Sequence, residues 1–169
     1  MPDVAFSIVP LTDQDRSAFS CGSAPLDTYL QRQASQDIKR RVAACFVAVD
    51  TATGAIAGYY TLSACQVYLD DIPDDWHRKL PKYPTVPAVR LGRLAIDLRF
   101  QGQKFGSALL ANAAARACRS EIAFHMMLID AKDAPVAAFY QHHGFQRDPR
   151  DPLRLYAPLA TLGKALGVL

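Results

Sequence analysis

Residues 92–119 read GRLAIDLRFQGQKFGSALLANAAARACR, and this stretch decides the fold. The apolar run at 88–97 predicts a strand, and the alanine-rich run at 106–119 predicts a helix. Gly102 and Gly106 predict a tight turn where that helix begins. Because the amides of such a turn and the positive helix end face the same point, the pattern predicts a site for a phosphate or pyrophosphate. An ordinary tight turn is the alternative, since neither the Walker phosphate loop nor the dinucleotide fingerprint fits.

The segments on either side predict a mixed α/β sheet. The apolar run 126–130 predicts a buried strand, and 134–143 a helix that begins near Pro135 and stops at Gly144. A strand, a helix and a second strand in this order require at least one parallel crossover. The other predicted elements are a strand at 4–9, a helix at 24–40 with Ser23 as N-cap, strands at 43–49 and 55–68 joined by a turn at 50–54, an irregular connection at 69–87 with a short helix near 76–80, a strand at 154–158 and a short C-terminal helix.

Length and composition indicate the class of protein. The chain has 169 residues, half of them hydrophobic, and a net charge of +3 from 19 basic and 16 acidic side chains. These values are typical of one globular domain, predicted to cover residues 1–169, and they exclude a collagen-like chain or a small disulfide scaffold. No run reaches the roughly eighteen apolar residues of a membrane span, and no signal peptide is evident. Four cysteines without zinc-like spacing predict reduced thiols, no metal site and a cytoplasmic protein.

A second motif occupies residues 130–145, which read DAKDAPVAAFYQHHGF. Together with QGQKFG at 101–106, it resembles the GNAT superfamily of N-acetyltransferases. The acyl-CoA loop of that family has Gln or Arg, two residues, Gly, one residue, and Gly or Ala, and its next helix carries Phe-Tyr ahead of Gly-Phe. The resemblance implies acetyl-CoA as donor and the GNAT fold, an α/β protein. That fold has a mixed, mostly antiparallel twisted sheet, flanked by helices, with a central parallel strand pair splayed for acyl-CoA.

Four further stretches narrow the resemblance to GNAT toxins of bacterial toxin–antitoxin modules, and the similarity extends over 19–159. It implies that the protein acetylates the α-amine of aminoacyl-tRNA and so blocks translation. It also implies a ribbon-helix-helix antitoxin, a homodimer, and contact with DNA only through the antitoxin complex. The stretches are FSCGSAPLDTYL at 19–30, GYYTLSA at 58–64, LPKYPTVPA at 80–88 and LGRLAID at 91–97.

The same resemblance assigns roles to individual residues. Backbone groups of Leu94, Ala95 and Ile96 would hold the pantetheine arm, and one amide would polarise the acetyl carbonyl. Tyr140 would protonate the departing CoA thiolate, which suits a phenol because the two ordinary pKa values, about 10 and about 8.5, are close. Without the motif, a core aromatic is the better interpretation of Tyr140. The other implied coenzyme contacts are Gln101, Gly102, Gln103, Lys104, Phe105, Gly106 and Ser107 in the loop, and Asp133 and Phe139 after the next strand.

Lys104 departs from the family motif, which has glycine at this position of the loop. If the position requires a positive φ, lysine costs about 1 kcal/mol there. Its ammonium group could instead add positive charge beside the coenzyme phosphates. Coenzyme binding is the prediction in both cases.

The acidity of the acceptor amine distinguishes lysine from an aminoacyl ester as substrate. Attack requires a neutral amine, and at pH 7 about one lysine ε-amine in a few thousand is neutral, against more than about one α-amine in ten. A lysine acetylase therefore benefits from a strong base beside the acetyl group. The predicted strand 88–97 has no Glu and no His, and its one acid, Asp97, comes at the end. The pattern favours an aminoacyl ester over lysine.

Basic residues form two groups suited to RNA phosphates, since residues 31–41 and residues 86–107 each carry a net charge of +3. Strict alternation puts Arg90 and Arg93 on opposite faces of their strand, unless a bulge near Gly92 intervenes. A solvated protein surface is the alternative. The candidate tRNA contacts are Lys39, Arg40, Arg41, Arg90, Arg93 and Lys132.

Two other functions stay open at this point. One is a GNAT enzyme that acetylates a small amine or a protein N-terminus, which would show weak salt dependence. The other is a non-catalytic protein, in which Lys104 prevents turnover and the chain acts with an antitoxin as a DNA-bound corepressor. Affinity for acetyl-CoA separates the second alternative from an enzyme.

Overall fold

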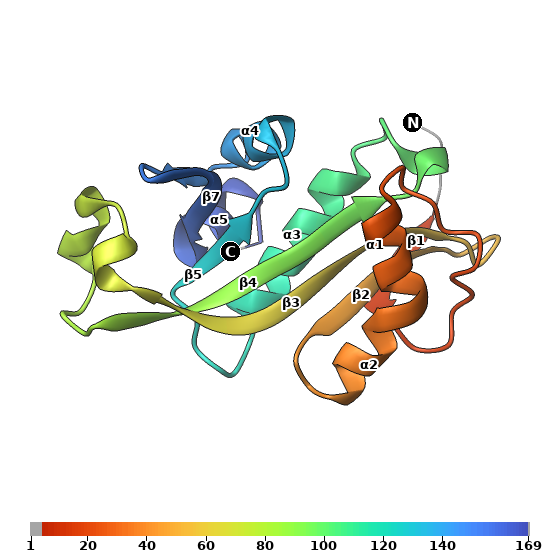
Figure 1. The fold of residues 1–169 in the computed structure, drawn as a ribbon, viewed down its shortest axis with the longest axis horizontal. Coiled ribbons are helices and arrows are strands. Elements are labelled where there is room, and N and C mark those ends of the chain that lie inside the picture. Colours follow the sequence, from red (N-terminus) through yellow and green to blue (C-terminus); the bar gives the residue numbers. More distant parts are fainter. Residues whose placement is uncertain (1–4, 169) are drawn as a thin grey trace. The chain divides into compact units, whose positions relative to one another are not determined.

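The computed structural model describes residues 5–168 (Figure 1). The chain forms two compact units. The first runs up to Ser63 and includes Gly92–Ala113, and the second consists of Ala64–Leu91 with the residues from Ala114 onward.

The strands belong to one seven-stranded sheet with the order β1-β2-β3-β4-β5-β7-β6. Strands β3 (Ile56–Tyr68) and β4 (Thr85–Ile96) and helix α3 (Phe105–Cys118) each pass from one unit into the other. Strand β4 is parallel to β5 (Met126–Asp130), whereas β1 with β2, β2 with β3, and β7 with both β5 and β6 are antiparallel. The predicted fold class, a mixed and mostly antiparallel α/β sheet with one parallel pair, is confirmed.

In the first unit, β1 (Phe6–Pro10) and β2 (Ala44–Asp50) pair antiparallel with each other, and β2 pairs with β3. The predicted strand 4–9 is thus shifted toward Pro10, and its first residue lies outside the described part of the chain. The predicted turn between β2 and β3 is confirmed, because Gly54 closes it with a left-handed backbone (φ +74°).

The helix predicted at 24–40 is present as three consecutive segments: α1 (Ala24–Thr28), η1 (Tyr29–Gln33) and α2 (Ala34–Lys39). The middle segment is a π-helix, and the spacing of apolar residues did not indicate it.

The start of this helix lies where predicted, but its side-chain hydrogen bonds differ from the prediction. Ser23 has the extended backbone of an N-cap, but its side chain makes no capping hydrogen bond. Pro25 removes one of the two amides that a cap can bind, because proline has no N–H. Asp27 instead accepts a hydrogen bond from the amide of Cys21 (2.8 Å), which fixes the chain ahead of the helix.

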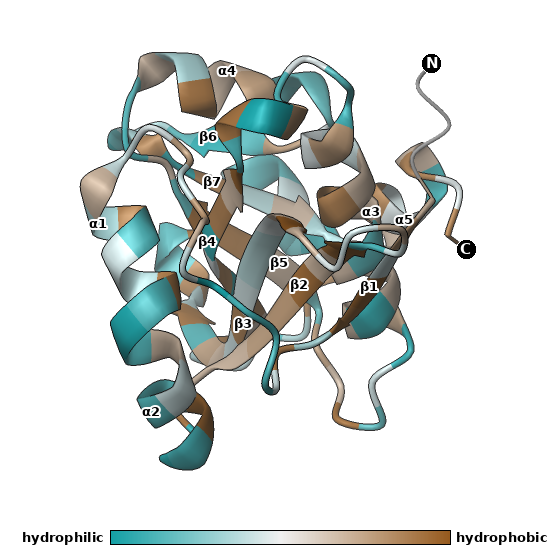
Figure 2. Cartoon of the chain, turned by 90° about the vertical axis from the view of Figure 1, so that its right-hand side faces the viewer, coloured by the Kyte–Doolittle hydropathy of each residue, from teal (hydrophilic) through white to brown (hydrophobic). Residues whose placement is uncertain are grey.

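The core of the first unit lies between its sheet and its helices. Leu109 of α3 packs beside Gly58 of β3, where an added Cβ would lie 2.9 Å from Leu109 Cδ1. Tyr60 of β3 also donates a hydrogen bond to Asn112 of α3 (2.6 Å). Figure 2 shows α1 and α2 on one side of the strands and α3 on the other. The buried residues that join the α1–η1–α2 segment to the sheet include Tyr29, Leu30, Ala34, Val47, Tyr59 and Ala95.

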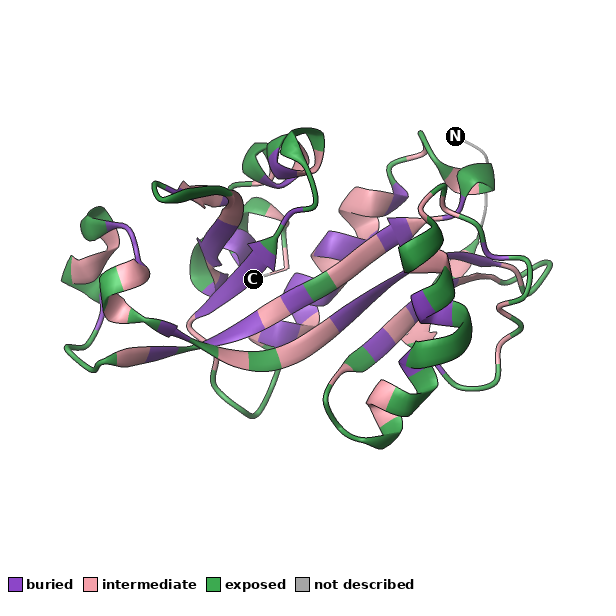
Figure 3. Ribbon diagram, viewed as in Figure 1, coloured by how far each residue is buried: buried purple, intermediate pink, exposed green. Residues whose placement is uncertain are grey.

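In the second unit, the parallel pairing joins Ala88–Arg90 to Met126–Leu128. Strand β5 then continues beside β7 (Asp151–Pro158) as far as Asp130. The pairing of β4 with β5 is therefore short, in keeping with the predicted splay. Figure 3 shows how buried and more exposed residues follow one another along β4.

Two more strand boundaries and one strand differ from the prediction. Strand β4 begins three residues earlier than expected. Pro87 does not interrupt it, because Pro87 is exposed and its carbonyl accepts a hydrogen bond from the amide of His125 (2.9 Å). Strand β7 begins at Asp151 rather than Arg154, and β6 (Gln146–Asp148) was not predicted. Three residues are too few for an alternating pattern to show.

The connection predicted at 69–87 contains two short 3-10 helices, η2 (Leu69–Asp71) and η3 (Asp74–Lys79). The segment covers part of one face of the sheet, with Trp76 packed edge-on against Tyr156 at 6.4 Å between ring centroids. The buried residues of this cluster are Val67, Ile72, Leu80, Val86, Ala88, Met126, Leu128 and Tyr156.

Helices α4 (Ala134–His142) and α5 (Leu159–Ala165) complete the second unit and contact β7. Gly144 ends α4 with a left-handed backbone (φ +99°), as predicted. The four cysteines are free thiols. No helix among residues 5–168 combines the length and apolar character needed to cross a membrane. The described residues also contain no group of three His, Cys, Asp or Glu side chains arranged for a metal ion.

Candidate functional site

The loop ahead of α3 has the predicted turn geometry. Gly102 and Lys104 both have left-handed backbones, with φ +78° and +63°, and α3 begins at Phe105. Lysine therefore stands where the loop does require a positive φ, at a cost of about 1 kcal/mol. Lys104, with this strained backbone, lies between Gly102 and Gly106 of the motif.

The same loop is suited to hold a phosphate. Lys104 O accepts a hydrogen bond from the amide of Ala108 (3.2 Å), so the hydrogen-bond ladder of α3 starts at Lys104. The first amides of an α-helix have no carbonyl acceptor within the helix, and that end carries partial positive charge. The Lys104 side chain is exposed, Phe105 is buried, and Gln103, Gly106 and Ser107 are half-buried.

The predicted coenzyme contact of Gln101 stays a prediction, and the side chain is hydrogen-bonded within the protein. Its side-chain amide donates hydrogen bonds to the carbonyls of Ile96 (3.0 Å) and Cys21 (3.1 Å). The side chain therefore closes the base of the loop and holds it to the segment ahead of α1. This arrangement makes Gln101 a positioning residue for the loop.

Asp97 also holds neighbouring segments together, at the end of β4. The sequence did not indicate this role. Its buried carboxylate accepts bonds from the amides of Ser20 (3.1 Å) and Arg99 (2.9 Å) and from the Arg99 guanidinium (2.9 Å). Burial alone would raise the pKa of Asp97, but the bonds from Arg99 and Ser20 lower it below its ordinary value. A carboxylate held this way is a poor proton acceptor, so Asp97 is not available as a catalytic base.

Leu94, Ala95 and Ile96 lie in β4, as predicted. Ala95 is buried in the core against the α1–η1–α2 segment, while Leu94 and Ile96 are half-buried. Ile96 Cδ1 would lie 2.8 Å from a Cβ at Gly58, which places it on the face that α3 covers. The strand is held at its end by the amide of Asp97, which donates to Ala57 O (2.8 Å).

Tyr140 lies on α4 and is 4% exposed. Its ring packs edge-on against Phe139 and Phe145, with centroids 5.1 and 5.6 Å away. Burial raises the pKa of the phenol, so the hydroxyl keeps its proton at neutral pH. No hydrogen-bond partner of this hydroxyl lies among the residues that the structure describes. The ring is thus fixed by packing, and its hydroxyl has donor capacity for a ligand.

The neighbours of Tyr140 have structural roles. Asp133 caps α4, because its carboxylate accepts a hydrogen bond from the amide of Val136 (3.0 Å). Phe139 also contacts the ring of His143, at 4.8 Å between centroids. Burial, together with the charge of His142, lowers the pKa of His143, so this imidazole is neutral at pH 7. The predicted coenzyme contacts of Asp133 and Phe139 stay predictions.

Of the predicted tRNA contacts, four lie in the first unit. Arg93 stacks on the ring of Tyr29, with the guanidinium carbon 3.5 Å from the ring centroid. It therefore lies on the side of the sheet covered by the helical segment that ends in Lys39, Arg40 and Arg41, all exposed. Arg41 has a left-handed backbone (φ +59°).

The remaining two, Arg90 and Lys132, belong to the second unit. Lys132 is exposed, and Arg90 is paired with Asp130 (2.8 Å).

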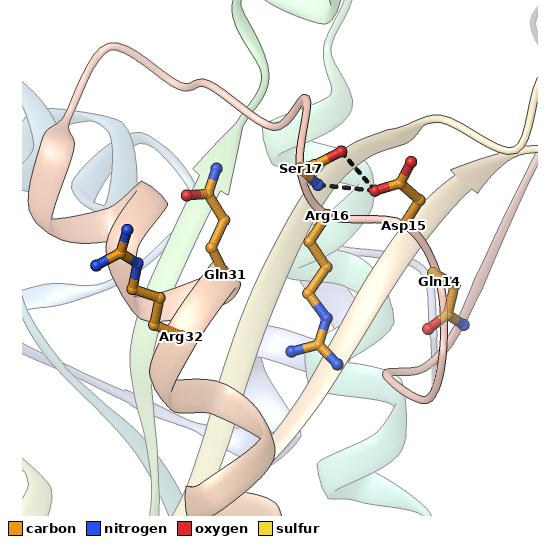
Figure 4. Close-up of a pocket in the computed structure, with 6 residues that line it drawn as sticks. All are labelled: Gln14, Asp15, Arg16, Ser17, Gln31 and Arg32. Atoms are coloured by element: carbon orange, nitrogen blue, oxygen red, sulfur yellow. Dashed lines mark hydrogen bonds between the residues drawn. The ribbon is translucent and has the colours of Figure 1, made fainter.

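The first unit also has an open hollow of about 460 Å³, shown in Figure 4, which the sequence did not indicate. Arg16, one of the two arginines that line it, donates to the carbonyls of Leu30 (3.1 Å) and Thr12 (3.0 Å). Asp15 accepts from the hydroxyl of Ser17 (2.6 Å). These polar groups hold the loop together and join it to η1, so the hollow is a feature of the surface and not the predicted site.

Comparison with known proteins supports this assignment of motifs. The chain matches the acetyltransferase (GNAT) domain model over residues 41–147. It is 34% identical over 143 residues to the tRNA-acetylating toxin of Mycobacterium tuberculosis, which covers 83% of this chain and 84% of that protein. It is 26% identical over 162 residues to the probable toxin TacT of Sinorhizobium fredii, covering 90% of each.

Solved structures agree with the fold. A tyrosine-to-phenylalanine variant of KacT matches with a TM-score of 0.85 and 26% identity, over 94% of this chain and 98% of that one. AtaT complexed with acetyl-methionyl-tRNAfMet matches with a TM-score of 0.85 and 25% identity, over 95% and 98%. AtaTR bound with acetyl-CoA matches with a TM-score of 0.77 and 25% identity, over 94% and 96%. With a domain match over more than half of its length and relatives that span nearly all of it, the chain belongs to the GNAT acetyltransferases.

Proposed function

We propose that this protein is a toxin that transfers the acetyl group of acetyl-CoA to the α-amine of aminoacyl-tRNA and thereby blocks translation. The observation that carries the proposal is the 34% identity to a tRNA-acetylating toxin over 83% of the chain. AtaT, at 25% identity, has been solved with acetyl-methionyl-tRNAfMet, the product of such a reaction.

The loop residues bind and orient the donor. Amides from Gln103 to Ser107 face the coenzyme diphosphate, and the Lys104 ammonium adds charge there. Backbone groups of Leu94–Ile96 hold the pantetheine arm, and one amide withdraws electron density from the acetyl carbonyl. Gln101 and Asp97 keep this loop and strand end in place through their bonds to Cys21 and Ser20.

Tyr140 donates the proton that the CoA sulfur needs when the thioester breaks. A thiol has an ordinary pKa near 8.5, so its thiolate accepts a proton from a phenol at modest cost. Because burial raises the pKa of Tyr140, the phenol is protonated when the reaction begins.

The acceptor amine must be neutral, and no base of the right strength is offered by Asp97, whose pKa is lowered. An α-amine with a pKa near 7.8 loses its proton to water often enough at neutral pH.

The proposed partners are a ribbon-helix-helix antitoxin, through which DNA is contacted, and a second copy of the chain in a homodimer. A charged tRNA substrate places the reaction in the cytoplasm, and we expect residues 1–169 to act as one domain.

Mass spectrometry of a charged tRNA pool, incubated briefly with protein and acetyl-CoA, tests the proposal. We expect acetylated aminoacyl ends with the wild type, and a rate lower by about 10²–10⁴-fold with Tyr140→Phe. Tyr83→Phe, which changes an exposed phenol, is the matched control. If the wild type acetylates a small amine or a peptide N-terminus readily and leaves aminoacyl-tRNA unmodified, the tRNA assignment is wrong.

A further inference from the structure

Three charged residues meet on adjacent strands of the second unit. Asp130, at the end of β5, accepts a hydrogen bond from Arg90 Nη1 of β4 (2.8 Å). It also accepts from Arg154 of β7, through Nε (2.8 Å) and Nη2 (3.3 Å). One carboxylate thus joins two guanidinium groups. We call Arg90 and Arg154 the arginine pair, and the three residues together the cluster.

The position of the arginine pair on the sheet follows from strand alternation. Residues two apart on a strand share a face, so Arg90 follows Ala88, Asp130 follows Leu128, and Arg154 precedes Tyr156. Ala88, Leu128 and Tyr156 are buried under the segment that carries η2 and η3. The arginine pair and Asp130 lie on the same face, beyond the segment that carries η2 and η3. All three side chains reach solvent. Arg90, Arg154 and Asp130 are 39%, 36% and 40% exposed.

The cluster has cationic donors to offer a ligand. A guanidinium has five N–H donors, of which Arg90 uses one on Asp130 and Arg154 uses two. Arg90 also interacts with Cys65, and Arg154 with Tyr156, and each arginine still has donors left over. Partial burial of Asp130 alone would raise its pKa, but the bonds and charges of Arg154 and Arg90 lower it. The carboxylate is therefore ionised at neutral pH, and the cluster keeps a net charge of +1.

The backbone pairing of β4 with β5 and of β5 with β7 already holds these strands together. Exposed ion pairs contribute about 0–1 kcal/mol. What the shared carboxylate does achieve is orientation, because it holds two flexible, partly exposed side chains beside each other on one face of the sheet. Two guanidinium groups held this way match the oxygens of a phosphate.

We propose that Arg90 and Arg154, oriented by Asp130, bind a backbone phosphate of the tRNA substrate. This inference rests on the proposed function. The diphosphate of acetyl-CoA is already served by the amides of the loop ahead of α3, whereas a tRNA brings one phosphate with every nucleotide. The sequence alone indicated Arg90 as a candidate tRNA contact. Arg154 and Asp130 are brought beside it only by the pairing of the strands.

Binding of deacylated tRNA to the full chain, measured by fluorescence anisotropy over a series of KCl concentrations, tests the proposal directly. We expect Arg90→Gln and Arg154→Gln each to weaken binding about tenfold at low salt. Each should also reduce the slope of log affinity against log salt by about 0.9, the value for one phosphate contact. Arg119→Gln, which removes an exposed arginine outside the cluster, should change neither quantity.

Arg154→Lys separates phosphate binding from a merely structural role. Lysine keeps the charge and loses the planar fork, so the salt slope should return to the wild-type value while affinity recovers only in part. A role confined to pairing with Asp130 predicts instead that the salt slope is already at the wild-type value in Arg154→Gln. Thermal unfolding of each variant shows whether it is folded.

The outcomes are distinct from those of the proposed function. If tRNA affinity and salt slope are the same in the wild type and in both glutamine variants, phosphate binding by the arginine pair is wrong, although the enzyme can still acetylate aminoacyl-tRNA. If the variants instead raise the KM for acetyl-CoA and leave tRNA binding unchanged, the cluster serves the coenzyme and the proposal is also wrong. A wild type that binds tRNA through these arginines but does not acetylate it contradicts only the proposed reaction.

Discussion

The amide of Ser20 donates a hydrogen bond to Asp97 Oδ2 (3.1 Å), although 77 positions separate the two residues in the sequence. The amide of Leu98 donates in turn to Ser20 O (2.8 Å). These two bonds, with the one from Gln101 to Cys21 O, fasten the segment ahead of α1 to the strand end that leads into the phosphate loop. The loop is therefore held from outside its own motif.

Asp97→Asn should lower the free energy of unfolding by about 2–3 kcal/mol at pH 7, because an amide cannot accept all the bonds that the buried carboxylate accepts. The pKa of Asp97 is lowered in the folded protein, so its contribution is present above the ordinary value near 3.9 and is lost as the pH falls below it. Urea unfolding at pH 7 and pH 3 should therefore show a smaller difference between wild type and variant at pH 3. Asp75→Asn, at an exposed position, is the control, and equal differences at both pH values would contradict this account.

Lys104→Gly should raise the free energy of unfolding by about 0.5–1 kcal/mol, because glycine takes the left-handed backbone without strain. The KM for acetyl-CoA should rise at the same time, since the loop loses a positive charge. Gly102→Ala is the matched opposite, and should lower the free energy of unfolding by about 1–2 kcal/mol, since an added Cβ there meets no atom within 4 Å and only the backbone opposes it. Urea unfolding and steady-state kinetics measure the two effects. A less stable glycine variant at position 104 is the result that contradicts the argument.

The rate of acetyl transfer to aminoacyl-tRNA should rise with pH between about 6 and 9 and level off above the amine pKa near 7.8. The acceptor must lose its proton, whereas Tyr140 keeps its own because burial raises its pKa. A pH profile of kcat/KM under single-turnover conditions measures this. A fall in rate above pH 8 would show that a group of lower pKa than Tyr140 donates the proton.

Local patterns in the sequence predicted most of the elements that carry the site. The two turn glycines and the alanine-rich run located the loop and α3, and the Phe-Tyr motif located α4 and its buried tyrosine. The sequence also predicted what a positive φ would mean at Lys104. These features depend on neighbours in the chain, because turn geometry and helix periodicity involve residues only a few positions apart.

Other features could not be predicted in this way. The π-helical turn at Tyr29–Gln33 leaves the apolar spacing nearly unchanged, so it has no signal of its own. The sequence suggested Gln101 as a coenzyme contact and gave no sign that its side chain bonds to Cys21 O. Strand β6 was too short to be recognised, although it pairs with β7.

From the amino-acid sequence alone came the family motifs, the order of strands and helices in the central part of the chain, and the residue types at each turn. Only the tertiary structure decided which distant groups meet: Ser20 with Asp97, Arg93 with Tyr29, and Arg90 and Arg154 with Asp130. The reason is physical. A turn or a helix start is set by the conformational preferences of a few consecutive residues, whereas the partner of a charge is set by strand register and by which face of the sheet each side chain occupies.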